Sequence, residues 1–198
     1  ARDLTLSGIA ADDCETGIHV LARPAAIVDR RFLDFAVDIA DVRLRRCTNW
    51  SVRVESLSEQ RATGVSIDTC EIAATSASGG NGGVGLANTD GVRLGKVTLE
   101  HSQAVTSFVA VNIGQLTVDD LKLDISLPKA RDDAPPCARI ANTGGVINSM
   151  AVRWPSAPEQ WRPVLLKPRA ACDPVSPQPV INTLTVEPSF LADRAITC

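Results

Sequence analysis

Apolar positions along the chain follow a short phrase that recurs: apolar, any residue, apolar, two polar residues, apolar, any residue, apolar. Full copies occupy residues 65–72, 92–99 and 116–123, and shorter copies begin at Val42, Ile147 and Ile181. Within each half of the phrase every second residue is apolar, which is the period of a β-strand with one buried face. The two central polar residues predict a tight corner between two short strands. A phrase that returns every few tens of residues is typical of a solenoid, in which each turn of chain packs on its neighbours.

The corners of the phrase are rich in Asp, Asn and Gly, which tolerate left-handed backbone and bond to their own main chain. They fall at residues 45–46, 68–69, 95–96, 119–120, 148–149 and 182–183. Successive copies are 23 (Val42 to Val65), 27 (Val65 to Val92) and 24 residues (Val92 to Leu116) apart, and the next two intervals, 29 and 34 residues, are longer. We therefore expect coils of roughly 23 residues, with loops of variable length inserted at fixed corners.

A third strand is expected before each phrase, in residues 84–91, 109–115 and 138–145, where an apolar pair is followed by Asn and Gly near a turn. Three strands per coil, two-residue corners and Asn-x-x-Gly turns resemble the right-handed parallel β-helix of the pectin-lyase-like superfamily, over residues 36–187. The resemblance concerns the fold. We expect an all-β, right-handed parallel β-helix of six or seven coils in a single domain, with residues 1–35 as a cap or irregular first coil and residues 188–198 as a tail.

Composition narrows the classes of partner. The chain has 198 residues, 44% of them hydrophobic, and a formal net charge of −3. This length fits one domain with a buried core. A nucleic-acid-binding surface needs a basic stripe or patch, so we expect no nucleic acid. No apolar run approaches the roughly 20 residues of a membrane helix, and we expect no membrane insertion.

Six cysteines, at positions 14, 47, 70, 137, 172 and 198, are compatible with disulfides and an oxidising compartment. None are paired at the short spacings of a zinc site, and we expect neither a metal nor a cofactor. Cys47 and Cys70 are predicted to occupy the same inward position of consecutive coils, as small buried hydrophobes. We expect at least one disulfide among Cys137, Cys172 and Cys198, which lie in or near Pro-rich segments.

The superfamily includes polysaccharide lyases, polygalacturonase-like hydrolases and viral tail spikes, and in its enzymes the substrate groove lies along the outward residues of a strand. Here the phrase predicts two outward columns, which are Arg43, Ser66, Arg93 and Thr117, and Thr48, Glu71, Thr98, Lys122, Ala151 and Thr185. Only Glu71 is acidic, whereas a calcium-dependent lyase needs several converging oxygen ligands. The columns therefore argue mildly against catalysis.

Asn88-Thr89-Asp90-Gly91 is similar to a motif of the polygalacturonase-like hydrolases, and this resemblance implies a catalytic role for Asp90. The Gly-His-Gly motif of that family is absent, and Arg139-Ile140 is followed by Ala141 where the family has lysine. The alternative is that residues 88–91 simply make a turn, as residues 142–145 are expected to do.

Carboxylates at the corners offer a second catalytic arrangement. Asp68 lies two coils from Asp119 and Asp120, which at about 4.8 Å per coil is roughly 10 Å. This slightly exceeds the separation of about 6.5–9.5 Å between the carboxyl groups of inverting glycosidases. Lys96, on the coil between them, is placed to hold a sugar carboxylate or to neutralise its neighbours. The alternative is a solvated polar corner.

Candidate substrate-binding residues are Lys96, Arg93, Glu71, Trp154 and Trp161; the two indoles either stack on sugar rings or pack a Pro-rich loop. Our leading hypothesis is a non-catalytic structural or binding module, extracellular, on a cell surface or on a virion. Its expected partners are a polysaccharide or cell-surface glycan and further copies of itself. The alternative is a polysaccharide hydrolase or lyase that uses Asp90 with Asp68, Asp119 or Asp120.

Overall fold

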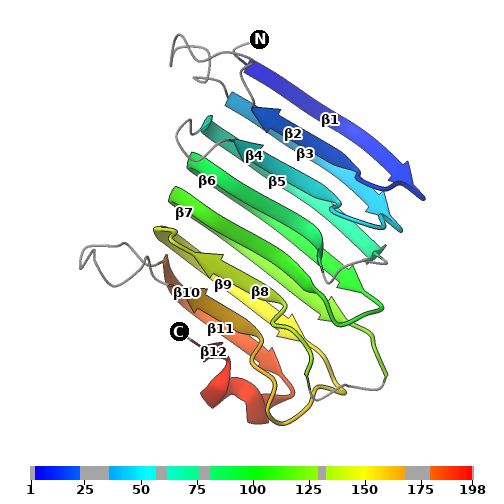
Figure 1. Cartoon of the computed structure of the whole chain (residues 1–198), viewed down its shortest axis with the longest axis vertical. Helices are drawn as coiled ribbons and strands as arrows, with labels where there is room; N and C mark the ends of the chain where they lie inside the picture. Colours follow the sequence, from blue (N-terminus) through cyan, green and yellow to red (C-terminus); the bar gives the residue numbers. More distant parts are fainter. Residues whose placement is uncertain are drawn as a thin grey trace.

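The computed structural model describes residues 3–22, 36–56, 62–75, 81–128, 133–167 and 179–197. The strands are β1 (Asp3–Asp12), β2 (Ile18–Ala22), β3 (Ala36–Arg45), β4 (Val52–Ser56), β5 (Ala62–Thr75), β6 (Asn81–His101), β7 (Thr106–Ile125), β8 (Ala138–Ala141), β9 (Gly145–Arg153), β10 (Val164–Lys167), β11 (Pro179–Glu187) and β12 (Ile196–Thr197), with a 3₁₀ helix, η2 (Ser189–Arg194), before the last strand. All 12 strands belong to one hydrogen-bonded sheet, and Figure 1 shows them stacked in chain order.

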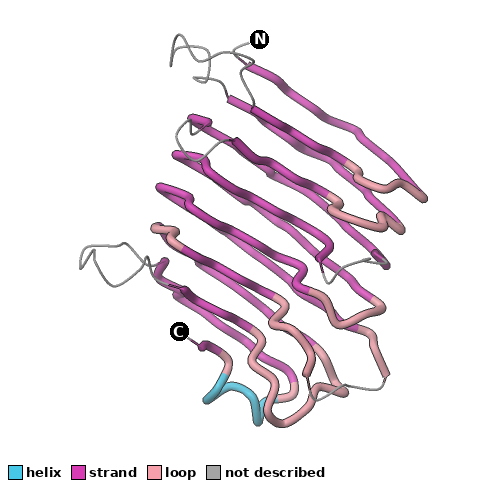
Figure 2. The backbone as a smooth tube through the Cα atoms, viewed as in Figure 1, coloured by secondary structure: helices cyan, strands magenta, loops and turns pink. Residues whose placement is uncertain are grey.

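The stack is a parallel all-β solenoid, as the phrase predicts. A long series of strands pairs in the order β1, β3, β5, β6, β7, β9 and β11, and every pairing is parallel. A short series pairs β2, β4, the first part of β6, the first part of β7, β8, β10 and β12. Each coil therefore runs through one member of the long series and then one of the short series. Figure 2 shows the loops that follow the long strands on one side of the stack.

The apolar positions of the phrase form the core. In β6, Val92, Leu94, Val97 and Leu99 are all buried, and the corner lies between Leu94 and Val97. The matching residues of β7 are also buried and pair with them in register. Full burial of such a side chain stabilises a fold by about 1.5–3 kcal/mol. Because each coil repeats this burial, the core is continuous along the stack.

The predicted register is wrong in the second coil. Val37 pairs with Val65 and Val42 with Cys70, so the corner of β3 is at residues 40–41 and not at residues 45–46. The interval to the next copy is therefore 28 residues, from Val37 to Val65. Two apolar pairs with the same spacing follow one another in this strand, and the pattern alone fits either pair. The hydrogen-bonded pairing of β3 with β5 selects the earlier one.

This shift also changes two other assignments. Arg43 pairs with Glu71, so it belongs to the second outward column, and Asp38 takes its place beside Ser66 in the first. Cys47 lies beyond the end of β3 and does not share a position with Cys70.

Left-handed backbone is found at fewer corners than expected. Gly8 (φ 66°) and Asp41 (φ 51°) adopt it, whereas the later corners in the described ranges turn without it. Three asparagines at the opposite turn of the coil adopt it instead: Asn88 (φ 57°), Asn112 (φ 60°) and Asn142 (φ 46°). Nδ2 of Asn112 donates to Oδ1 of Asn88 at 2.6 Å, and Nδ2 of Asn142 donates to Oδ1 of Asn112 at 2.8 Å. We call these three residues the asparagine ladder.

Both ends of the described chain join the stack. Residues 1–35 are expected to form a cap or an irregular first coil. β1 pairs with β3 from Asp3 to Asp12, so residues 3–22 form a first coil, while residues 23–35 lie outside the described residues. After β11, η2 buries Leu191 against the last coil, and β12 pairs with β10.

Of the three cysteines expected to provide a disulfide, Cys137 is a buried free thiol that donates to the Pro163 carbonyl oxygen at 3.2 Å. Cys172 and Cys198 lie outside the described residues.

Candidate functional site

A shallow hollow of about 320 Å³ crosses the outward face of β3, β5, β6 and β7, in the segment of each strand that directly precedes its corner. We call it the axial groove, because it runs from coil to coil. Its floor is low because small residues, Ala36, Gly64 and Gly91, pair in register across it. Apart from Gly64 itself and its two neighbours in the chain, no atom lies within 4 Å of the position that a Cβ of Gly64 would take. One side of the groove is lined by Asp38, Ser66, Arg93 and Thr117.

Arg93 is the cation of the axial groove, and its side chain is 66% exposed. Its Nη2 lies 3.1 Å from Oδ2 of Asp119, which holds the guanidinium near the corner. Asp38 lies two coils away on the same side. The groove thus offers a carboxylate, two hydroxyls and a guanidinium over a backbone floor, a set suited to a hydroxyl-rich polymer.

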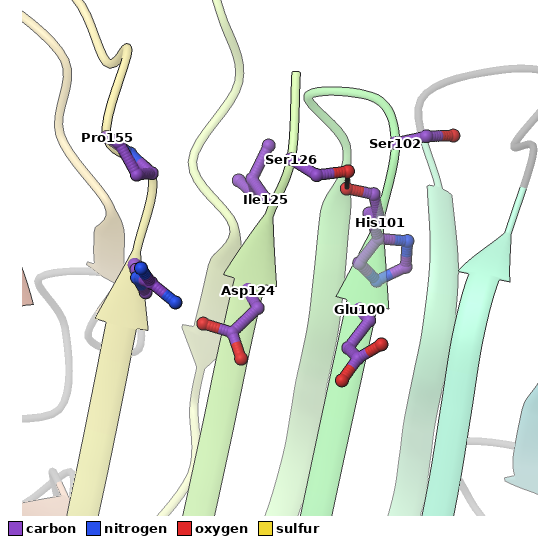
Figure 3. A pocket seen from close by; sticks show the side chains of 8 residues that line it. Glu100, His101, Ser102, Asp124, Ile125, Ser126 and Pro155 are labelled. Carbon is purple, nitrogen blue, oxygen red and sulfur yellow. Dashed lines mark hydrogen bonds between the residues drawn. The ribbon is translucent and has the colours of Figure 1, made fainter. Parts of the chain in front are cut away.

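A second hollow, of about 390 Å³, lies where β6, β7 and β9 end; we call it the edge pocket (Figure 3). Glu100, Asp124 and Arg153 line it from equivalent positions of three successive coils. Figure 3 shows the carboxylates of Glu100 and Asp124 side by side on neighbouring strands. Sequence reasoning missed this pocket. The available signal was position, since each of the three residues directly follows the last apolar residue of a phrase.

His101 forms part of the wall of the edge pocket. Its side chain is 1% exposed, and burial lowers its pKa to about 4, so the imidazole is neutral at pH 7. Its carbonyl oxygen accepts hydrogen bonds from the Ser126 backbone N–H at 2.8 Å and from Ser126 Oγ at 3.1 Å. Arg153 forms an ion pair with Glu187 of the next coil, with its Nε 3.2 Å from Oε2 of Glu187. The pocket therefore presents two carboxyl groups and a guanidinium beside an imidazole that is neutral at pH 7.

The corner carboxylates predicted as catalytic lie outside both hollows. Oδ2 of Asp119 accepts a hydrogen bond from Arg93, and its Oδ1 accepts one from Nδ2 of Asn148 at 3.3 Å. Asp120 lies 3.5 Å from the Lys122 ammonium and 3.2 Å from Ser149 Oγ. Hydrogen bonds thus join the corner side chains of neighbouring coils.

Asp68 stands in the same column as Asp119, with Gly95 between them. A Cβ on Gly95 would lie 2.5 Å from Oδ1 of Asp68, so only glycine lets these coils approach at this point. Lys96 is exposed, and its Cα is paired with that of Asp120.

The other predicted residues are placed as follows. Asp90 is exposed and directly precedes Gly91 at the axial groove, while Asn88 belongs to the asparagine ladder. Glu71 pairs through its backbone with Arg43 and Thr98, and its side chain is not among those described.

Trp154 and Trp161 lie in the core, with their rings 4.8 Å apart in an edge-to-face arrangement. Their indole N–H groups donate to the carbonyl oxygens of Leu127 at 3.0 Å and Pro135 at 2.8 Å. Each ring thereby fixes a loop on the stack. Loop packing is the role that the structure supports, because neither ring presents a face to a sugar.

Comparisons with protein-family models, with curated proteins and with solved structures found no match to the chain. Among the described residues, no helix is long and apolar enough to cross a membrane. Within the same ranges, His, Cys, Asp and Glu side chains form no group of three or more that would hold a metal ion.

Proposed function

We propose that the chain is a structural and binding module displayed outside the cell, on a cell surface or on a virion, like part of a tail spike or an extracellular appendage. The ligand we assign to it is a polysaccharide or cell-surface glycan lying in the axial groove. The likeness to the right-handed parallel β-helix of the pectin-lyase-like superfamily is part of this proposal. Parallel strands with two-residue corners support it.

One observation carries the proposed ligand: the axial groove continues across four strands and has an open backbone floor at Gly64. A linear polymer laid along the solenoid axis meets a new coil about every 4.8 Å. It can therefore reach Asp38, Ser66, Arg93 and Thr117 in succession. Arg93 favours an anionic sugar, because a guanidinium binds carboxylate and sulfate groups through paired N–H donors.

The test fills the groove. Gly64→Phe places a ring where no neighbouring atom lies within 4 Å of the new Cβ, so the fold is expected to survive. Thr185→Phe adds the same ring at an exposed position of β11, outside the groove. On an array of neutral, uronic-acid and sulfated glycans, we expect wild type and Thr185→Phe to bind the same glycans and Gly64→Phe to lose them. Equal binding by all three proteins, or binding by none, contradicts the proposal.

A second candidate function, polysaccharide hydrolysis, is favoured by the edge pocket. Glu100 and Asp124 are paired on adjacent strands, so their backbones are about 4.8 Å apart. Retaining glycosidases use two carboxyl groups about 5–5.5 Å apart. Release of reducing sugar that disappears in both Glu100→Gln and Asp124→Asn would support this candidate. Release that persists in both variants but disappears in Asp90→Asn would place the chemistry at the groove instead.

Self-association completes the proposal. Among the side chains that the structure describes, the large apolar ones that stay exposed lie in the first and last coils, and they are Leu4, Leu21, Val180, Phe190 and Ile196. End-to-end contact between copies would bury these side chains. In sedimentation velocity we expect concentration-dependent assembly that Phe190→Asp weakens and Thr98→Asp, in a middle coil, does not. A wild-type chain that stays monomeric at high concentration contradicts this part of the proposal.

A further inference from the structure

Two cysteine side chains meet in the turns that follow the first two long strands. Cys14 follows β1 and Cys47 follows β3, 33 residues apart in sequence, and their Sγ atoms are 2.9 Å apart as free thiols. They need to approach by less than about 1 Å to reach the disulfide bond length of about 2.05 Å. The sequence pattern gave no sign of this pair, because it placed Cys47 in the wrong register.

Backbone and side-chain contacts hold these two turns together. The Thr48 N–H donates to the Cys14 carbonyl oxygen at 3.0 Å. Beside the thiols, Arg46 donates to both carboxylate oxygens of Asp13, at 2.6 and 2.9 Å. The sulfur atoms are therefore brought together by an interface that exists without a covalent bond.

The first coil is one of the two end coils of the described stack. β1 pairs with β3 on one edge only, and Leu4 is exposed although its neighbours in the core series are buried. A solenoid coil is stabilised by its neighbours, so an end coil with one neighbour opens at a lower free energy than a central coil.

We propose that Cys14 and Cys47 form a disulfide in an oxidising compartment, and that this bond fastens the first coil, β1 and β2, to the second. The proposal does not depend on the ligand or on the assembly proposed above. It assigns a covalent modification to a defined pair of side chains.

The reaction balances with a glutathione-type disulfide, RSSR, as the oxidant. One cysteine thiolate attacks RSSR, breaks its S–S bond and releases RS⁻, leaving a mixed disulfide. The second cysteine thiolate attacks the cysteine sulfur of the mixed disulfide and releases the second RS⁻. The two protons lost by the cysteines end on the two RS⁻ groups. The cysteine pair loses two electrons, and RSSR gains them.

Exposure decides the order of these attacks. Cys14 is half-buried, whereas Cys47 is fully buried. Burial, with the adjacent Cys14 thiol, also raises the pKa of Cys47 to about 12. Cys14 is therefore the first nucleophile, and Cys47 completes the bond from the core side. The buried thiol of Cys137 contacts a backbone carbonyl and serves as an internal control.

The test uses the whole chain, reduced and then incubated with glutathione disulfide, followed by alkylation and peptide mapping without reductant. We expect a peptide containing Cys14 joined to one containing Cys47, lighter than the sum of the two thiol peptides by two hydrogens. Cys137→Ala is expected to retain this link, and Cys14→Ser and Cys47→Ala are expected to lose it. Two alkylated thiols at positions 14 and 47, or a link from either one to another cysteine, would overturn the proposal.

Hydrogen exchange tests the fastening itself. Amides of β1 are expected to exchange about tenfold faster, or more, in the reduced protein than in the oxidised one, while amides of β7 stay unchanged. Cys14→Ser changes the half-buried position and cannot form the link. After the same treatment with glutathione disulfide, its β1 amides are expected to exchange as fast as those of the reduced wild-type protein. A Cys14–Cys47 link that leaves β1 exchange unchanged would overturn the fastening role.

Discussion

Asn112 is the central member of the asparagine ladder, and replacing it tests what holds the turns of neighbouring coils in register. Its amide donates to Asn88 and accepts from Asn142, and its backbone is left-handed with φ of 60°. Asn112→Ala removes both hydrogen bonds and leaves an alanine in left-handed backbone. Asn112→Gly removes the same bonds, but glycine adopts this backbone without strain.

The expected losses follow from these two contributions. A side-chain hydrogen bond contributes about 0.5–1.5 kcal/mol net, so losing two lowers the free energy of unfolding by about 1–3 kcal/mol. Left-handed backbone costs an ordinary L-residue roughly 1–2 kcal/mol more. We therefore expect Asn112→Ala to lose about 2–5 kcal/mol and Asn112→Gly to lose about 1–3 kcal/mol.

Urea unfolding, followed by circular dichroism and by fluorescence of the buried Trp154 and Trp161, measures both variants against wild type. The reasoning requires the order wild type, Asn112→Gly, Asn112→Ala, from most to least stable. A glycine variant that is no more stable than the alanine variant would refute the left-handed contribution. Two variants within about 0.5 kcal/mol of wild type would refute the ladder as a source of stability.

Three further predictions concern the core and the edge pocket. Gly145 has φ of 120° and lies against the Leu116 backbone, where a Cβ would clash with the carbonyl oxygen. Gly145→Ala is therefore expected to lower the thermal midpoint of unfolding steeply. Gly64→Ala, at a position with open space, is expected to leave the midpoint nearly unchanged. Leu121→Ala, at a fully buried position, is expected to cost about 2–5 kcal/mol in urea unfolding, and a loss below about 1 kcal/mol would contradict the packing described. In the folded protein the pKa of His101 is lowered to about 4, whereas its value in the unfolded chain is about 6.5. Between these pH values the unfolded chain binds a proton at His101 that the folded protein does not. The free energy of unfolding therefore decreases as the pH falls from about 6.5 to about 4. This loss amounts to about 3 kcal/mol, and a His101→Gln variant with the same decline in stability between these pH values would contradict it.

The sequence was sufficient for the fold wherever one alignment of the phrase was available. Residues 92–99 and 116–123 predicted their buried positions and corners correctly, because alternation and a two-residue corner admit one register there. In β3 two apolar pairs compete, and hydrophobicity alone does not separate them. Choosing between them requires the backbone pairing of the neighbouring strand.

The edge pocket was missed although the phrase aligns its residues, because its side chains lie one position beyond the last apolar residue of the phrase, outside the outward columns that were searched. Glu100 and Asp124 are 24 residues apart in sequence and adjacent in the stack. The corner carboxylates were easier to notice because they lie inside the phrase. Their partners, Arg93, Asn148, Lys122 and Ser149, belong to the same coil or to neighbouring coils and were not recognised from the sequence.

The positions of the two hollows on one repeated unit allow their roles to be separated. β6 and β7 carry part of the axial groove before their corners and part of the edge pocket at their ends, so the two hollows lie on opposite sides of the corner. Gly64→Phe alters only the first, and Asp124→Asn only the second. If the wild-type protein binds glycan without turnover, and only Gly64→Phe loses this binding, the protein is a binding module. Turnover that is lost only in Asp124→Asn, with glycan still bound, would mark a hydrolase whose groove delivers the polymer to chemistry at the edge.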